Sequence, residues 1–319
     1  VFDPTDSSFA LVDISSTIST DKKFIGAVTA SNGKIIFAPS NADGVGVFDP
    51  TNNSFLLVDI SSTISTDDKF SGAVTASNGK IIFAPLNADG VGVFDPTDNS
   101  FTLVDISSTI SINGGKFNGA ATASNGKIIF APYKADGVGV FDPTDSSFAL
   151  VDISSTISTD FKFHGAATAS NGKIIFAPLF ADGVGVFDPT DNSFALVDIS
   201  PTISTDQKFA GAATASNGKI IFAPVNADGV GVFQAVRPCD ASIAPTNGGG
   251  GNCTSSLASG STCQPTCDSG YTVSGTSSCS SVGTLTAATC TAVVTSGTPT
   301  PTPSVLIVLL ITFVCALFL

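Results

Sequence analysis

Apolar and polar positions along residues 70–105 mark out four short segments of the kind that form strands. They lie at residues 70–76, which are rich in small side chains, at 80–84, which are continuously apolar, and at 90–94 and 100–105. A Ser-Asn-Gly segment and an Asp-Pro-Thr segment separate them, and both have the composition of turns. No segment has the 3.6-residue period of an amphipathic helix. The pattern predicts four antiparallel strands.

This pattern recurs along most of the chain. The phrase Val-Phe-Asp-Pro begins at Val1, Val47, Val93, Val140 and Val186, and a shortened copy begins at Val232. The period is 46 residues, with one extra residue near Gly114 in the third copy. Four short strands in a repeat of this length are typical of a β-propeller blade. A solenoid, the alternative, has shorter or helical repeats. We therefore predict an all-β, five-bladed propeller over residues 1–233.

The wording of the repeat also resembles a known family. Residues 72–83 read Gly-Ala-Val-Thr-Ala-Ser-Asn-Gly-Lys-Ile-Ile-Phe, and residues 90–97 read Gly-Val-Gly-Val-Phe-Asp-Pro-Thr. Together they resemble the YVTN/NHL-type propeller repeats. The resemblance implies an inner strand of small residues, a turn, an apolar strand and a third strand that ends in Asp. Kelch repeats fit less well, because their Gly-Gly doublet and paired Tyr and Trp are absent.

The two ends of the repeat region complement each other. Residues 1–14 hold the end of a third strand and a full fourth strand, Ser8 to Ile14, whereas residues 209–233 hold strands one to three of a last blade. Pairing these ends would close a five-bladed ring and remove exposed sheet edges. The chain starts without Met and partway through a repeat, so we interpret it as a fragment or a mature segment. With further upstream repeats, the ring would have six to eight blades.

The copies differ from one another mainly in two loops. One leads into the first strand (the lead-in loop), and the other joins the second strand to the third (the 2–3 loop). In an antiparallel blade both loops lie on the same side, so we predict a ligand-binding face there, because loops on rigid scaffolds often carry function. Neutral drift after duplication is the alternative. The predicted binding residues are Ile25, Ser40, Ser71, Leu86, Asn118, Tyr133, His164, Leu179, Phe180, Ala210 and Val225; Phe161 and Lys134 also vary.

Lysine and aspartate also recur near these loops. We expect both to lie on the same face and to form exposed ion pairs worth less than about 1 kcal/mol each; an alternating ring of charges that binds a polar ligand is the other interpretation. The lysines are Lys23, Lys69, Lys116, Lys162 and Lys208, and the aspartates are Asp43, Asp89, Asp136, Asp182 and Asp228.

Composition and charge narrow the function. The formal charge of −13 argues against nucleic acid, whose binding proteins present a basic face. The one histidine, His164, is not repeated in the other copies, and no phosphate loop or calcium-loop spacing is present. We therefore predict no catalytic residue, no metal and no cofactor.

Six cysteines follow the propeller within residues 239–290. Such a cluster is typical of a disulfide-stapled module from an oxidising compartment. Pro and Asn-Gly after the first Cys, and Cys267-Asp-Ser-Gly-Tyr-Thr-Val-Ser-Gly, resemble a sushi (complement control) module, although the usual Trp before the last Cys is missing. The resemblance implies the pairs Cys239–Cys279 and Cys267–Cys290, which leaves Cys253–Cys263. Spacing alone permits fifteen pairings.

The C-terminal residues point to a membrane. Residues 291–304 form a Thr/Pro-rich stalk, and 305–319 form an apolar run that is short for a spanning helix. We predict a GPI signal with attachment at Ser296, or else a membrane-anchor tail or a buried segment. Asn52 and Asn252 lie in N-glycosylation sequons.

Taken together, these features predict a non-enzymatic, extracellular, membrane-anchored protein for recognition or adhesion, with a glycan or protein ligand. Two alternatives stay open. One is an enzyme of the lactonase or lyase type, which the family resemblance implies. The other is a structural component of a cell coat.

Overall fold

A computed structural model describes residues 1–112, 114–235, 238–257, 260–280 and 284–293. Within these residues the protein is all-β and contains no helix. Contacts divide the chain into two compact units, Val1–Arg237 and Pro238–Leu319. The first unit holds the repeats and the second holds the six paired cysteines.

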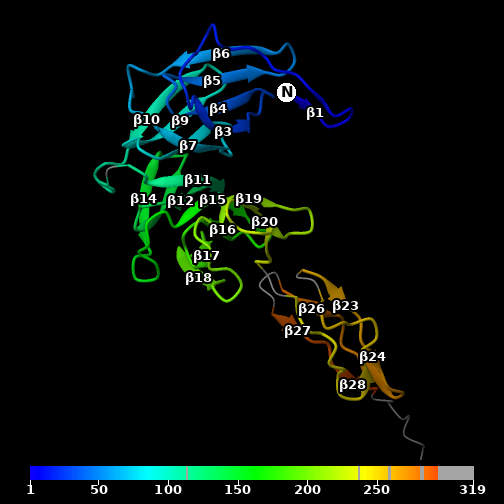
Figure 1. Ribbon diagram of the computed structural model, residues 1–319. Helices are drawn as coiled ribbons and strands as arrows, with labels where there is room; N and C mark the ends of the chain where they lie inside the picture. Colours follow the sequence, from blue (N-terminus) through cyan, green and yellow to red (C-terminus); the bar gives the residue numbers. More distant parts are fainter. Residues whose placement is uncertain (113, 236–237, 258–259, 281–283, 294–319) are drawn as a thin grey trace, which may run out of the picture. The chain divides into compact units, whose positions relative to one another are not determined.

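The first unit is a series of four-stranded antiparallel blades, which confirms the predicted fold class (Figure 1). Strand order within each blade follows the sequence. Blade A consists of β3 (Phe24–Thr29), β4 (Ile35–Pro39), β5 (Gly44–Asp49) and β6 (Ser54–Asp59). Blade B consists of β7 (Phe70–Thr75), β8 (Ile81–Pro85), β9 (Gly90–Asp95) and β10 (Ser100–Asp105). Blade C consists of β11 (Phe117–Thr122), β12 (Ile128–Pro132), β13 (Gly137–Asp142) and β14 (Ser147–Asp152). Blade D consists of β15 (Phe163–Thr168), β16 (Ile174–Pro178), β17 (Gly183–Asp188) and β18 (Ser193–Asp198).

Each apolar core lies between two blades. At the A–B junction, Ile36, Val45 and Ile60 of blade A pack against Phe70 and Phe83 of blade B. The continuous apolar run of the second strand is buried because a neighbouring blade covers each of its faces. Burial of one such side chain contributes roughly 1.5–3 kcal/mol. A blade is therefore stabilised mainly by its neighbours, as in other repeat proteins.

The first strands of successive blades lie side by side and contact one another through glycine. Gly119 on β11 has φ of +94°, and a Cβ placed there would lie 2.7 Å from the Cα of Gly165 on β15. The pairing register shifts at this point, between Phe117 and Ala120, as at a bulge. Only glycine accepts this backbone conformation at so close an approach.

The two ends of the repeats do not pair as the sequence predicts. β1 (Phe2–Asp3) pairs with β2 (Ser8–Phe9) in a separate two-stranded sheet. The last blade, blade E, is a three-stranded sheet of β19 (Phe209–Thr214), β20 (Ile220–Pro224) and β21 (Gly231–Phe233), with no fourth strand among the described residues. The predicted closure by residues 8–14 is therefore wrong for this structure. The glycines of neighbouring first strands contact one another, and the strand pattern does not reveal these contacts.

The second unit is held by short strands and by three disulfides. The bonds are Cys239–Cys279, Cys253–Cys263 and Cys267–Cys290, the pairs that the sushi resemblance implies. Its strands are β22 (Gly248–Gly249), β23 (Thr262–Cys263), β24 (Thr266–Cys267), β25 (Tyr271–Val273), β26 (Ser277–Cys279), β27 (Leu285–Thr286) and β28 (Cys290–Ala292).

The predicted apolar tail and the GPI attachment at Ser296 lie outside the described residues, as does most of the predicted stalk. The residues that are described contain no helix long and apolar enough to cross a bilayer. Asn52 and Asn252, of the two sequons, are both exposed.

Candidate functional site

The two variable loops of each blade are joined by backbone hydrogen bonds. In blade B, the Leu86 amide of the 2–3 loop donates to the Lys69 carbonyl of the lead-in loop at 2.9 Å. The same 2–3 loop also reaches the next blade, because the Lys116 amide donates to the Leu86 carbonyl at 2.8 Å. Equivalent bonds recur at the three other junctions between blades A and E. The variable loops of the five blades therefore form one continuous hydrogen-bonded series, here called the variable face.

The side chains predicted to bind a ligand differ in their exposure. Those of Ser40, Ser71, Asn118 and Leu179 are buried, and the Ser71 hydroxyl donates to Asn118 Oδ1 at 2.6 Å. These four residues support the face from beneath. The accessible members are Ile25 and Val225, which are exposed, and the half-buried Leu86, Tyr133, His164, Phe180 and Ala210.

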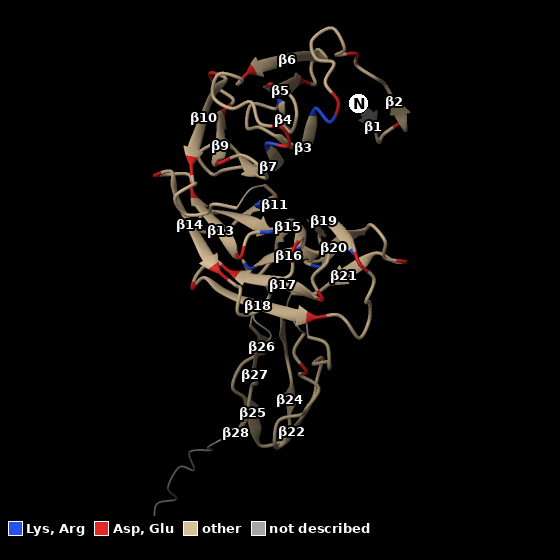
Figure 2. Cartoon of the chain, turned by 60° about the vertical axis from the view of Figure 1, so that its left-hand side comes forward, with Lys and Arg blue, Asp and Glu red and all other residues tan. Residues whose placement is uncertain are grey.

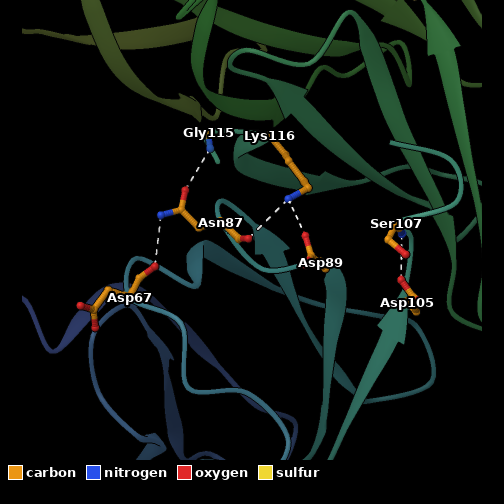
Figure 3. A network of polar contacts seen from close by, with 7 residues as sticks. All are labelled: Asp67, Asn87, Asp89, Asp105, Ser107, Gly115 and Lys116. Atoms are coloured by element: carbon orange, nitrogen blue, oxygen red, sulfur yellow. Dashed lines mark hydrogen bonds and ion pairs between the residues drawn. The ribbon is translucent and has the colours of Figure 1, made fainter. Parts of the chain in front are cut away.

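Polar side chains tie neighbouring blades together beneath this face, as Figure 3 shows for blades B and C. Asn87 Nδ2 donates to the Asp67 carbonyl at 3.1 Å, and Asn87 Oδ1 accepts from the Gly115 amide at 3.0 Å. Lys116 Nζ reaches back to Asp89 Oδ1 at 3.1 Å and to the Asn87 carbonyl at 3.4 Å. The Asn87–Asp67 bond joins the two variable loops of blade B, and the contacts of Gly115 and Lys116 link blade B to blade C.

Three of the recurrent lysines form the predicted ion pairs, but the lysine side chains are not exposed. The pairs are Lys116–Asp89 at 3.1 Å, Lys162–Asp136 at 4.0 Å and Lys208–Asp182 at 3.6 Å. Lys69, Lys116, Lys162 and Lys208 are buried at the junctions, near the starts of the inner strands (Figure 2). Lys162 Nζ donates to the Ala135 carbonyl at 3.1 Å, which satisfies part of its charge. Burial lowers the pKa of Lys69 and of Lys162.

The aspartate partners of these lysines are exposed, as expected; the Asp89 side chain is 79% accessible. A lysine stem can pack in an apolar junction while its ammonium reaches solvent-facing oxygens. The predicted exposure of the lysine side chains was wrong, because a lysine in a polar loop resembles a surface residue in the sequence. One signal was available, since the lysine directly precedes the first-strand Phe in every copy.

One junction of the variable face is aromatic. Between blades C and D, the Tyr133 ring packs edge-on against Phe161, with centroids 4.9 Å apart, and lies 6.3 Å from the His164 ring. Phe161 also contacts Phe180 at 5.7 Å, and Lys134 Nζ lies 4.8 Å from the centroid of the Phe161 ring. We call these five residues the aromatic patch. They come from variable positions. At the B–C junction, the equivalents of Tyr133, Lys134, Phe161, His164 and Phe180 are Leu86, Asn87, Gly115, Asn118 and Lys134.

The backbone at Phe161 indicates that its ring was not selected for local conformation. Phe161 has φ of +57°, and the equivalent residues Lys22, Asp68, Gly115 and Gln207 also have positive φ, so the conformation belongs to every copy of the repeat. Asp and Gly accept the left-handed region readily, whereas a bulky aromatic residue does so at a cost of roughly 1–2 kcal/mol. A strained residue on a loop is a reason to look for a function.

Burial also affects His164 and Tyr133 of the aromatic patch. It lowers the pKa of His164 and raises the pKa of Tyr133. Both side chains are therefore neutral at pH 7, and each keeps a hydrogen-bond donor. Within the ranges that the structure describes, no group of three or more His, Cys, Asp or Glu side chains is arranged to hold a metal ion.

No protein-family model matches the sequence, and no curated protein matches it. Solved structures match it in fold. Virginiamycin B lyase from Staphylococcus aureus has 13% sequence identity and a TM-score of 0.56, over 67% of this chain and 68% of its own. A streptogramin B lyase has 17% identity and a TM-score of 0.53, over 65% of this chain and 64% of its own.

An extracellular domain of a hybrid two-component system from B. thetaiotaomicron is also similar, with 15% identity and a TM-score of 0.55, over 74% of this chain and 32% of its own. This chain thus spans about two thirds of each lyase and one third of the extracellular protein. None of these is described as a sushi module, so that resemblance stays a prediction. At such low identity the likeness shows the fold alone: the first unit is built like the β-propellers of these proteins.

Proposed function

We propose that the first unit is a non-enzymatic recognition domain of an extracellular protein, and that it binds a glycan at the aromatic patch. The observation that carries this proposal is the gathering of Tyr133, Phe161, His164 and Phe180 at a single junction, at positions where the other copies have no aromatic residue. The C–H faces of a sugar ring pack well against aromatic rings. The Tyr133 hydroxyl, the His164 ring and the Lys134 ammonium supply hydrogen bonds.

Charge and cysteine chemistry support the extracellular setting. Three disulfides are typical of proteins from oxidising compartments. Anchoring through residues 305–319, by GPI or by a membrane tail, remains part of the proposal. Treatment of expressing cells with phosphatidylinositol-specific phospholipase C tests it: release supports GPI attachment at Ser296, and retention contradicts it.

The chain itself supplies a variant that tests the patch. Tyr133→Leu, Lys134→Asn, Phe161→Gly and His164→Asn together introduce the residue types that the B–C junction carries at Leu86, Asn87, Gly115 and Asn118. On a glycan array we expect the wild-type chain to bind a defined set of sugars and the fourfold variant to lose at least ten-fold in affinity.

Val225→Leu is the matched control, because it changes a variable position away from the patch. It should bind as the wild type does. Glycan binding that survives the fourfold substitution would contradict the patch as the site. A wild-type chain that binds a protein but no glycan would replace the ligand class, and binding to neither would favour a structural coat component.

A second candidate is an enzyme of the lyase or lactonase type. It is favoured by a half-buried, neutral His164 beside the Tyr133 ring, an arrangement able to exchange a proton. Lyases are among the proteins of similar fold. Turnover of cyclic ester substrates that is lost in His164→Ala, but kept in Val225→Leu, would establish this alternative.

A further inference from the structure

The turn between the first and second strands contains the same Asn-Gly pair in all five blades. Each copy reads Thr-Ala-Ser-Asn-Gly-Lys-Ile-Ile-Phe, with the asparagine at Asn32, Asn78, Asn125, Asn171 and Asn217. In an Asn-Gly pair the asparagine side chain can close a ring onto the next backbone nitrogen, and glycine, which has no Cβ, hinders this step least. Because the local sequence is the same in each copy, a difference in reactivity between these asparagines must come from the fold.

The hydrogen bonds inside the turn are also the same. In blade B, Asn78 Oδ1 accepts from the Lys80 amide at 3.1 Å, and in blade D, Asn171 Oδ1 accepts from the Lys173 amide at the same distance. The glycine amide of each turn donates to the carbonyl of the alanine three residues before it, at 2.9 Å in every copy. The backbone nitrogen that would close the ring is therefore restrained equally in these turns.

The bond that the asparagine makes outside its own turn differs between blades. In blades A to C its Nδ2 donates to a proline carbonyl of the next blade, in the turn after the third strand, at 3.0 Å. The pairs are Asn32–Pro96, Asn78–Pro143 and Asn125–Pro189. Asn171 Nδ2, on blade D, makes no such bond to any residue that the structure describes. Only the first three asparagines are tied to the next blade.

The missing bond of Asn171 follows from the sequence of blade E. Gln234-Ala235 follows the third strand there, where blades A to D have Asp-Pro. In blade C, Asp142 Oδ1 holds this turn by accepting from both the amide and the hydroxyl of Thr144. A glutamine side chain is one carbon longer and does not form this short carboxylate turn. In blade E the third strand, β21, ends at Phe233, before the position of that aspartate.

From these differences we infer that Asn171 is a site of spontaneous deamidation, whereas Asn32, Asn78 and Asn125 are protected. The Gly172 nitrogen loses its proton and bonds to Asn171 Cγ, while the Cγ–Nδ2 bond breaks and ammonia leaves. Water then opens the resulting succinimide at either carbonyl, which yields aspartate or isoaspartate. In the protected copies, the side chain must first break its bond to the next blade before Cγ can turn toward the glycine nitrogen.

The strength of one hydrogen bond sets the size of the expected difference. The net contribution of such a bond corresponds to a change in rate of roughly two- to ten-fold. Asn171 is half-buried and the three protected asparagines are exposed. Ring closure consumes no water, so partial burial does not prevent it. The carbonyl that Asn217 would bind belongs to a blade beyond blade E, so the inference concerns Asn171 only.

Tryptic digestion of the full, unmodified chain tests the inference. A lysine precedes each first strand, so residues 24–34, 70–80 and 163–173 form separate fragments, each with one of these asparagines and a mass of its own. During incubation at mildly alkaline pH, we expect fragment 163–173 to gain the mass of one deamidation at least three-fold faster than the other two. In concentrated urea, which separates the blades, the three rates should be similar. Equal rates in the folded chain would overturn the inference.

A variant tests the role of the bond to the next blade. Asp142→Gln with Pro143→Ala gives blade C the two residues of blade E and disrupts the turn that Asn78 binds. We expect Asn78 to deamidate at least three-fold faster, and Asn32 in the same molecule to keep its wild-type rate. An unchanged rate at Asn78 would also overturn the inference. If Asn32 accelerates as well, the substitution has unfolded the blades, and the comparison of fragments from the wild-type chain decides.

Discussion

In blades A to D, a threonine donates two hydrogen bonds to one aspartate and fixes the turn after the third strand. In blade C the Thr144 hydroxyl and amide both donate to Asp142 Oδ1, at 2.6 and 3.0 Å. The Thr hydroxyl, followed by the Thr amide, lowers the pKa of Asp142 below its usual 3.8. The same arrangement lowers the pKa of Asp49, Asp95 and Asp188. At the residue scale, the repeats therefore carry the same carboxylate turn several times.

Acid should weaken the propeller through these turns. A carboxylate whose pKa is depressed in the folded state contributes stability above its unfolded pKa and loses it as pH falls through the folded value. We expect urea midpoints to be nearly constant from about pH 7 to pH 5 and to fall below about pH 4. Thr144→Val removes the hydroxyl donor to Asp142, so its midpoint should fall less steeply with acid. An equal slope in this variant would contradict the role of that bond.

The buried lysines are a second feature at the residue scale. Two substitutions of one lysine distinguish the stability contributed by its aliphatic stem from that contributed by its charge. Lys116→Ala should cost about 2–4 kcal/mol of unfolding free energy, because it leaves a cavity at the B–C junction. Lys116→Met keeps the volume and loses an ion pair with the exposed Asp89, so it should cost less than about 1.5 kcal/mol. Urea unfolding measures both. Equal losses would mean that the charge, and not the stem, stabilises the junction.

At the scale of the strand, contacts between the inner strands decide how blades meet. The threonine before each first turn adds a bond between blades: Thr122 Oγ1 donates to the Thr75 carbonyl at 3.1 Å, and Thr168 Oγ1 donates to the Thr122 carbonyl at 2.8 Å. In each threonine bond the acceptor is a backbone carbonyl, and in each glycine pair the contact is with a backbone atom. Larger side chains at these threonine and glycine positions would therefore meet backbone that cannot easily move.

Two glycine substitutions separate conformation from contact. Gly119→Ala and Gly211→Ala both place a Cβ on a residue with φ near +90°, but only the first would clash with a neighbouring strand. Gly211→Ala should cost about 1–2 kcal/mol, from the left-handed conformation alone. Gly119→Ala should cost at least about 2 kcal/mol more, because backbone must move to admit it. Similar urea midpoints for the two variants would show that the close approach is unimportant.

The strands of each blade could be predicted from the sequence, whereas the contacts between neighbouring blades could not. Repeated apolar runs between Ser-Asn-Gly and Asp-Pro turns predict four strands per copy, because they depend on local chemistry. Ring closure depends on how neighbouring blades meet, and the close contacts of Gly119 and its equivalents are not visible in the strand pattern. Comparison of the copies did identify Tyr133 and His164 as variable. Their meeting with Phe161 depends on which loops become neighbours in space.

On the scale of the whole molecule, each of the two units is stabilised by a different kind of interaction. The propeller repeats contain no cysteine, and their stability comes from apolar clusters shared between blades. The second unit buries few apolar side chains besides its cysteines, chiefly Ala241 and Leu257. Small units of this kind depend on disulfides.

Reduction should therefore unfold one unit and spare the other. After treatment with dithiothreitol, we expect amide exchange in residues 239–290 to approach that of an unfolded chain, since loss of native disulfides from a small unit typically costs about 2–5 kcal/mol. Peptides from blades A to E should keep their protection. Untreated protein is the control. Loss of protection in the blades as well would show that the units unfold cooperatively.

The near-identity of the blade junctions has a consequence for how such a gene can change. Every junction uses the same glycine, threonine, lysine and phenylalanine positions, so recombination between two repeats that adds or removes 46 codons exchanges one interface for an equivalent one. The variable positions in the loops of the variable face are not restricted to those shared residue types. A lineage can thus lengthen or shorten the propeller, and shuffle its surface residues, without first having to repair its core.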